Sequence, residues 1–81
     1  MNEEIITRWF RAEFLSGEVY GIYKARFQGS RYIDEQYWYL GSNSGWSSNS
    51  GVRDWFFIGK DSVWECTEEE AVQYLPESAL S

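Results

Sequence analysis

The side chains that most often carry out catalysis are scarce in this sequence. It has no histidine and one cysteine, Cys66. The lack of histidine removes the usual general base and a frequent metal ligand, and with them Ser-His-Asp and Cys-His catalysis. One cysteine cannot build a zinc or iron–sulfur site, and the sequence has no glycine-rich phosphate loop followed by lysine. We therefore expect no cofactor, no metal site and no enzymatic activity.

Carboxylates are the remaining candidates for acid–base chemistry. Asp34 and Glu35 are neighbours, and neighbouring side chains on a strand point to opposite faces, so they cannot act as a pair. A second group follows Thr67, completes a T-x-x-E capping box and lies where the helix dipole favours negative charge. It consists of Glu68, Glu69 and Glu70. Both groups are explained by structure, so neither predicts catalysis.

The elements that position these side chains are mainly strands. Three aromatic-rich strand patterns occupy 5–15, 18–27 and 32–40. Ser16-Gly17 indicates a two-residue type I′ turn between the first two, because glycine readily adopts positive φ. The register that follows pairs Phe14 with Val19, Ala12 with Gly21, and Phe10 with Tyr23 on the face that we expect to be buried. The alternative is a helix over 3–15, since Ile6, Phe10 and Phe14 recur every four residues.

The second turn leaves two registers open. With Gly29-Ser30 at its centre, Phe27 lies opposite Tyr32 and Trp38 covers Gly21. The same register pairs Lys24 with Glu35, and it brings Asp34 and Arg8 together above the small Ala25. We interpret Arg8 and Asp34 as a structural ion pair; the alternative is a polar anchor in an aromatic groove formed with Phe10, Tyr23 and Trp38. A three-residue turn over 28–30 would instead swap the faces of the third strand.

The second half of the chain begins with a low-complexity segment. Residues 41–51 are rich in glycine, serine and asparagine, which predicts a mobile loop. Trp46 at its centre either tucks back and pins the loop to the sheet or closes on a ligand. The later segments are predicted as a fourth strand over 52–58, a turn over 59–61, a fifth strand over 62–66, a helix from Thr67 to Leu75 that ends at Pro76, and a loose tail over 77–81.

Aromatic side chains are unusually abundant, with five Trp, six Tyr and five Phe in 81 residues. A small sheet cannot bury all of them, so some are expected in an exposed patch or a dimer interface. The face opposite the expected core carries the residue types that dominate interface hot spots. They are Trp9, Tyr20, Tyr37 and Tyr39, together with Arg11. This face predicts a partner-binding surface; the alternative is that the C-terminal segments cover it as a second core layer.

The net charge is −6 and falls mostly on the second half of the chain. Residues 41–81 contain seven acidic and two basic side chains, against six and five in 1–40. Such acidity repels phosphate backbones and favours a basic protein surface, so we expect no direct nucleic-acid partner. One cysteine allows no internal disulfide, which fits the cytoplasm. The N-terminus lacks a signal-peptide pattern, and no apolar run is long enough to cross a membrane.

These patterns predict a single α+β domain over 1–81, with a small twisted antiparallel sheet of about five strands and one short C-terminal helix. The expected function is a non-enzymatic protein-binding module, a small acidic inhibitor or adaptor that engages a basic protein surface. Its general character would suit a phage or mobile element. The expected partner-binding residues are Trp9, Arg11, Tyr20, Tyr37, Tyr39, Trp46, Glu68, Glu69 and Glu70. The alternatives are a domain that binds a carbohydrate or other small ligand through the Trp46 loop, and a homodimer.

Overall fold

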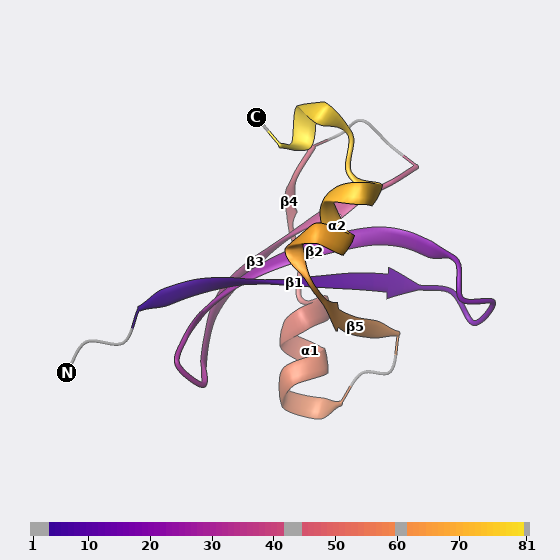
Figure 1. Cartoon of the computed structure of the whole chain (residues 1–81). Coiled ribbons are helices and arrows are strands. Elements are labelled where there is room, and N and C mark those ends of the chain that lie inside the picture. The colour runs from indigo at the N-terminus through magenta and orange to yellow at the C-terminus, as the bar shows by residue number, and fades with distance from the viewer. Residues whose placement is uncertain (1–3, 42–44, 60–61, 81) are drawn as a thin grey trace.

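Five antiparallel strands form one sheet in the order β4-β3-β2-β1-β5 (Figure 1). The computed structural model describes residues 4–41, 45–59 and 62–80. The strands are β1 (Ile5–Glu13), β2 (Val19–Gln28), β3 (Arg31–Tyr39), β4 (Ser47–Ser48) and β5 (Val63–Cys66). The helices are α1 (Gly51–Ile58), α2 (Glu68–Tyr74) and a 3-10 turn, η1 (Glu77–Ala79). The α+β class and the five-stranded antiparallel sheet are therefore confirmed, and α2 is the expected C-terminal helix. It is not the single helix that was expected, since α1 is a second one, and 77–79 form η1 where a loose tail was predicted.

The hairpin of β1 and β2 keeps most of the expected register, including Phe10 opposite Tyr23 and Ala12 opposite Gly21. The helical alternative for 3–15 is wrong. The turn itself is not the expected type I′ turn. Gly17 has a positive φ of 89°, but every residue with positive φ in the described chain is a glycine, so Ser16 has none. Serine therefore avoids the left-handed region that a type I′ turn demands of both central residues. The loop is one residue longer, and the register shifts so that Glu13, and not Phe14, faces Val19.

The pairing of β2 with β3 begins as expected and then slips by one residue. Phe27 lies opposite Tyr32, as the turn at Gly29-Ser30 requires. A register shift next to Phe27 then places Arg26 opposite Asp34 and continues to the end of the strand. The expected pairs of Lys24 with Glu35 and of Gly21 with Trp38 are therefore wrong. Because side chains alternate with a period of two, this single bulge reverses the faces of the rest of β3.

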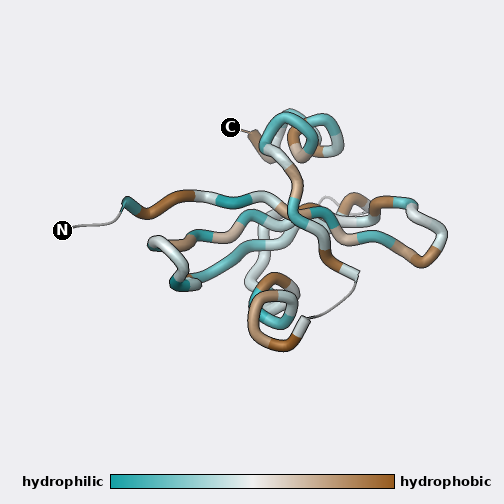
Figure 2. Tube along the Cα trace, turned by 60° about the horizontal axis from the view of Figure 1, so that its bottom comes forward, coloured by the Kyte–Doolittle hydropathy of each residue, from teal (hydrophilic) through white to brown (hydrophobic). Residues whose placement is uncertain are grey.

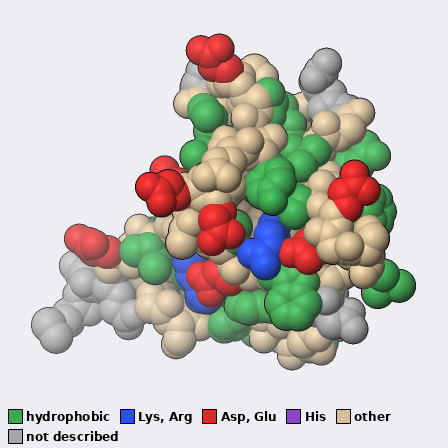
Figure 3. Space-filling view, turned by 45° about the vertical axis from the view of Figure 1, so that its right-hand side comes forward, with side chains coloured by type: hydrophobic (Ala, Val, Ile, Leu, Met, Phe, Trp, Pro, Cys, Tyr) green, Lys and Arg blue, Asp and Glu red, His purple; other side chains and the backbone are tan. Residues whose placement is uncertain are grey.

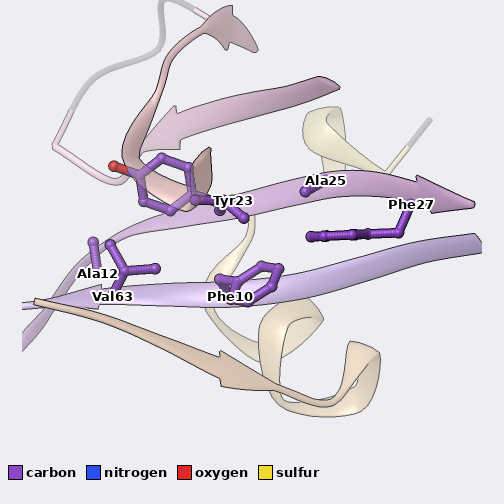
Figure 4. Packing of buried hydrophobic residues seen from close by; sticks show 7 residues of the cluster. Phe10, Ala12, Tyr23, Ala25, Phe27 and Val63 are labelled. Carbon is purple, nitrogen blue, oxygen red and sulfur yellow. The ribbon is translucent and has the colours of Figure 1, made fainter. Parts of the chain in front are cut away.

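Both faces of the sheet are covered. On one face α1 closes a core in which Trp55 contacts Phe10 and Phe56 contacts Phe27, with ring centroids 4.9 and 5.4 Å apart. Figure 4 shows strand residues of this core, among them Phe10, Tyr23 and Phe27. On the other face the C-terminal segment covers Ile22 and Trp38 with Ala71, Leu75 and Ala79. Figure 2 shows α1 and the C-terminal helices on opposite sides of the sheet. The structure thus has three layers, which explains how so many aromatic side chains are accommodated.

The predicted fourth strand over 52–58 is wrong, since this segment forms α1. Residues outside the helix cap the N–H groups of its first turn. The Asn49 carboxamide oxygen accepts a hydrogen bond from Gly51 N–H, and the Glu35 carboxylate accepts hydrogen bonds from the N–H groups of Val52 and Arg53. Gly59 ends the helix in the left-handed conformation. Val52, Trp55 and Phe56 face the sheet at helical spacing, a pattern that the dense apolar run concealed.

Gly51, the first residue of α1, leads to a specific prediction about stability. A Cβ atom on Gly51 would lie 2.2 Å from the hydroxyl oxygen of Tyr23, a side chain that is only 5% exposed. Alanine usually stabilises a helix relative to glycine by about 0.5–1 kcal/mol, but here the overlap reverses the sign. We expect Gly51→Ala to lower the free energy of unfolding by about 1–3 kcal/mol, measured by urea denaturation. Ser50→Ala, one residue earlier and exposed, is the control; a stabilised Gly51→Ala would contradict the packing described.

Candidate functional site

The segment from β5 to η1 forms an acidic surface. Residues 62–80 contain five glutamates and no lysine or arginine. The Thr67 hydroxyl accepts a hydrogen bond from Glu70 N–H at 3.1 Å, which confirms the Thr67 half of the predicted capping box at the start of α2. Ala71 and Leu75 are buried against the sheet, whereas the side chains of the first turn of α2 are exposed. Its exposed carboxylates are Glu68, Glu69 and Glu70, and Glu77 on η1 is exposed as well.

The arginines near this surface are already neutralised. Arg11 forms an ion pair with Glu13 and a second, at 3.7 Å, with Glu70. Arg8 binds both carboxylate oxygens of Glu65, at 2.6 and 2.7 Å. Figure 3 shows basic side chains lying directly beside acidic ones, with hydrophobic side chains around them. Within the described part of the chain, the remaining carboxylates of this segment have no ion-pair partner: Glu68, Glu69 and Glu77.

Large apolar side chains accompany these charges. Trp64 on β5, Tyr74 on α2 and Leu80 after η1 are each about half exposed, at 48, 46 and 51%. Trp64 lies opposite Arg11 in the sheet, next to the strand that α2 contacts. Exposed aromatic and aliphatic side chains mark a protein-binding surface, and carboxylates at its rim favour a basic partner. We call Trp64, Glu68, Glu69, Tyr74, Glu77 and Leu80 the acidic C-terminal surface.

The aromatic residues predicted to bind a partner do not form one surface. Trp9 lies under the C-terminal layer, whereas Tyr20 and Tyr37 pack on the opposite side of the sheet. Their expected common face is therefore wrong, because the register shifts reverse the faces on which they lie. Tyr39 is 48% exposed, and Tyr37 packs against Tyr23 with ring centroids 4.6 Å apart. The alternative of a covered face is confirmed, while the partner-binding role of each residue stays a prediction.

Trp46 pins its loop to the sheet. Its indole N–H donates to the Ala79 carbonyl at 3.3 Å, and its ring meets Trp9 and Trp38 edge-on at 6.4 and 5.5 Å. The Lys24 ammonium lies 4.2 Å from the ring centroid. This confirms the structural interpretation of Trp46; its role as a ligand platform stays a prediction. Of the predicted mobile loop, 42–44 lie outside the described residues, and Ser47–Ser48 form β4.

The expected pair of Arg8 and Asp34 is wrong. Asp34 instead binds Arg26 through both oxygens, at 2.8 and 2.5 Å. The Arg8 guanidinium lies 4.4 Å from the Phe27 ring centroid and binds Glu65, which sits opposite Phe10 on β5. The bulge explains the change, because it turns Asp34 to the face opposite Arg8. Arg8 is therefore part of the core edge and does not anchor a groove.

The Arg8–Glu65 pair predicts an acid-dependent loss of stability. The hydrogen bond from Arg8 lowers the pKa of Glu65 in the folded chain. A depressed carboxyl pKa stabilises the fold above the unfolded value, and this contribution is lost as pH falls. Urea titrations should show wild type losing more stability than Glu65→Gln between about pH 5 and about pH 3. The difference should be small, because the Glu65 side chain is 41% exposed. Parallel pH curves would contradict it.

Glu35 is a structural carboxylate, a role that the sequence did not predict for it. It is 6% exposed and accepts hydrogen bonds from the Tyr32 hydroxyl and from the N–H groups of Val52 and Arg53, at 2.8, 3.0 and 2.9 Å. Burial and this hydrogen bond raise the pKa of Tyr32. Glu35 thus joins β3 to the start of α1, where the helix dipole favours a negative charge. Its oxygens are engaged in these bonds, so it is suited to holding structure.

Burial raises the pKa of the Cys66 thiol, which packs half-buried opposite Trp9 against the core that contains Ile22. In the described ranges, no group of three or more acidic or cysteine side chains is placed to hold a metal ion. None of the helices in those ranges is both long and apolar enough to cross a bilayer.

Comparisons of the chain with protein-family models, curated proteins and solved structures give no match.

Proposed function

We propose that this chain is a non-enzymatic protein-binding module that engages a basic protein surface through its acidic C-terminal surface. The observation that carries the proposal is the charge pattern of that surface. Glu68, Glu69 and Glu77 are exposed without an ion-pair partner in the described chain, while Arg8 and Arg11 are held by other carboxylates. The surface therefore presents an uncompensated negative charge to a partner.

The apolar side chains give the proposed interface its affinity. Charges at the rim of an interface mainly steer association, and buried aromatic anchors contribute most of the binding energy. Trp64 and Tyr74 are half exposed in the free protein and can be buried by a partner. We propose that the basic side chains of the partner meet the glutamates while its apolar side chains cover this pair.

An inhibitor or adaptor role is the form of the proposal that the chain suits best. A negative, rigidly mounted surface can occupy a basic groove that otherwise binds nucleic acid, and so compete with it without binding nucleic acid itself. The single cysteine allows no internal disulfide, which is compatible with action in a reducing compartment, and we propose the cytoplasm. A phage or mobile-element origin is the corresponding proposal for its source.

The test compares wild type and two matched variants as baits in lysate of the source cells. Glu68→Gln/Glu69→Gln removes two negative charges from exposed positions with little change of shape. Glu4→Gln/Glu18→Gln removes the same charge from exposed positions just before β1 and just before β2. We expect a basic protein captured by wild type and by the second variant, with recovery reduced at least about tenfold for the first. Equal capture by all three baits would contradict the proposal.

A further inference from the structure

The outer edge of β3 is open beyond β4. The two residues of β4 pair only with Gln36 and Tyr37, so the stretch from Arg31 to Glu35 has no outer strand partner in the described chain. Leu40 N–H donates to Tyr20 on β2. Because backbone groups alternate along a strand, those of Glu35 point away from β2. This edge offers about 17 Å of backbone to an added strand.

Two hollows flank this edge, one on each face of the sheet, and share Asp34, Glu35 and Ser48. The first has a volume of about 480 Å³ and lies over Lys24, Arg26 and Gln36. The second, of about 510 Å³, lies beside α1 and is lined by Tyr32, Arg53 and Phe57. A strand laid against the edge would direct alternate side chains into the two hollows, because its side chains point to opposite faces in turn.

The chemistry of the hollows selects the side chains they accept. In the first, Asp34 engages Arg26 and the Glu35 carboxylate is turned to α1. The Lys24 ammonium, which lies over the Trp46 ring, therefore has no carboxylate partner in the described chain. This hollow favours an acidic side chain. In the second, Phe57 is 63% exposed and touches Tyr32, with ring centroids 6.2 Å apart, so an apolar side chain fits there.

We propose that the outer edge of β3 binds an extended peptide segment whose side chains alternate between acidic and apolar. The peptide backbone continues the line of β4 along β3, its acidic side chains reach the Lys24 hollow, and its apolar side chains pack on Tyr32 and Phe57. This site is separate from the acidic C-terminal surface and takes a ligand of the opposite charge. A chain with both surfaces joins two different partners, as an adaptor does.

The experiment uses an acetylated, amidated heptapeptide of alternating aspartate and leucine, added to ¹⁵N-labelled protein. We expect amide resonances of 31–35 to shift and their hydrogen exchange to slow. Lys24→Gln and Phe57→Ser should each weaken binding by about tenfold. Tyr74→Ser is the matched control for Phe57→Ser, since it removes an exposed aromatic from α2, on the face of the sheet opposite α1. A native-like spectrum of each variant establishes that it remains folded.

A second probe separates strand addition from simple charge attraction. The same heptapeptide with N-methyl groups on alternate residues, in each of the two registers, keeps its side chains but loses backbone donors. At least one register should fail to bind if main-chain hydrogen bonds hold the peptide. The proposal is overturned if both methylated peptides bind as well as the parent, if the shifts fall on α2, or if the parent peptide does not bind at about millimolar concentration.

Discussion

Replacing Glu35 with alanine is expected to lower the free energy of unfolding by about 3 kcal/mol, because three hydrogen bonds meet at this carboxylate. The change leaves the N–H groups of Val52 and Arg53 and the Tyr32 hydroxyl without their acceptor in a largely buried site. Each lost bond to a charged acceptor is worth about 1.5–3 kcal/mol, and the three are not additive. Urea denaturation followed by tryptophan fluorescence measures the loss.

The neighbouring residue supplies the control for Glu35. Asp34→Ala removes a carboxylate from the same strand, but the Asp34 side chain is 52% exposed and its ion pair with Arg26 lies on the surface. We expect that variant to stay close to wild type. Amide hydrogen exchange should show α1 opening first in Glu35→Ala. Equal stability of the two alanine variants would contradict the capping role of Glu35.

Replacing Trp46 with alanine is expected to cost about 2–3 kcal/mol, less than the range for a fully buried tryptophan because the ring is only half-buried. The variant loses the edge contacts with Trp9 and Trp38 and the hydrogen bond to the Ala79 carbonyl. These contacts join the loop, the sheet and η1. Thermal and urea unfolding measure the loss, and hydrogen exchange should show η1 opening more readily than in wild type.

The stability of Trp46→Ala, compared with that of a control variant in β4, distinguishes an anchoring role of Trp46 from a ligand-binding role. Ser48→Ala changes an exposed residue of β4 and should leave stability near that of wild type. A Trp46→Ala variant as stable as wild type would contradict the anchoring described and would favour a ring kept free for a ligand. Retained stability together with lost binding of a sugar would restore the Trp46 loop as a binding element.

The first hairpin shows how much of the fold follows from local pattern. Alternation of apolar residues correctly pairs Phe10 with Tyr23 and Ala12 with Gly21, because one buried face fixes the register. Pattern alone does not place bulges, which insert one residue without changing composition. The bulge beside Phe27 reversed the face of Asp34, and it therefore separated the expected ion pair with Arg8.

The segment 52–58 shows where local pattern fails. Seven residues that are mostly apolar read equally well as a buried strand or a buried helix. The signals for a helix lay at its ends, in Asn49 before it and Gly59 after it. The decisive cap comes from Glu35, which lies in another strand. A contact between distant segments has no local signature, so sequence reasoning missed both the helix and the role of Glu35.

The acidic C-terminal surface was predictable only where it depends on local sequence. The run Glu68–Glu70 and its cap at Thr67 are local features, and the structure has the cap as expected. The neutralisation of Arg11 by Glu13 and Glu70 depends on the packing of α2 against β1. Only the folded chain shows which carboxylates remain unpaired. It also shows that the C-terminal segment covers Trp9, whereas Trp64 stays half exposed.

The salt dependence of binding tests the central claim most directly. For a partner captured by wild type, the dissociation constant is measured at about 50 mM and about 300 mM salt for wild type and for Glu68→Gln/Glu69→Gln. An interface steered by exposed glutamates predicts that wild-type affinity falls steeply with salt and that the variant is weaker at low salt with a shallower dependence. Equal affinities at both salt concentrations for both proteins would contradict a role for the acidic C-terminal surface.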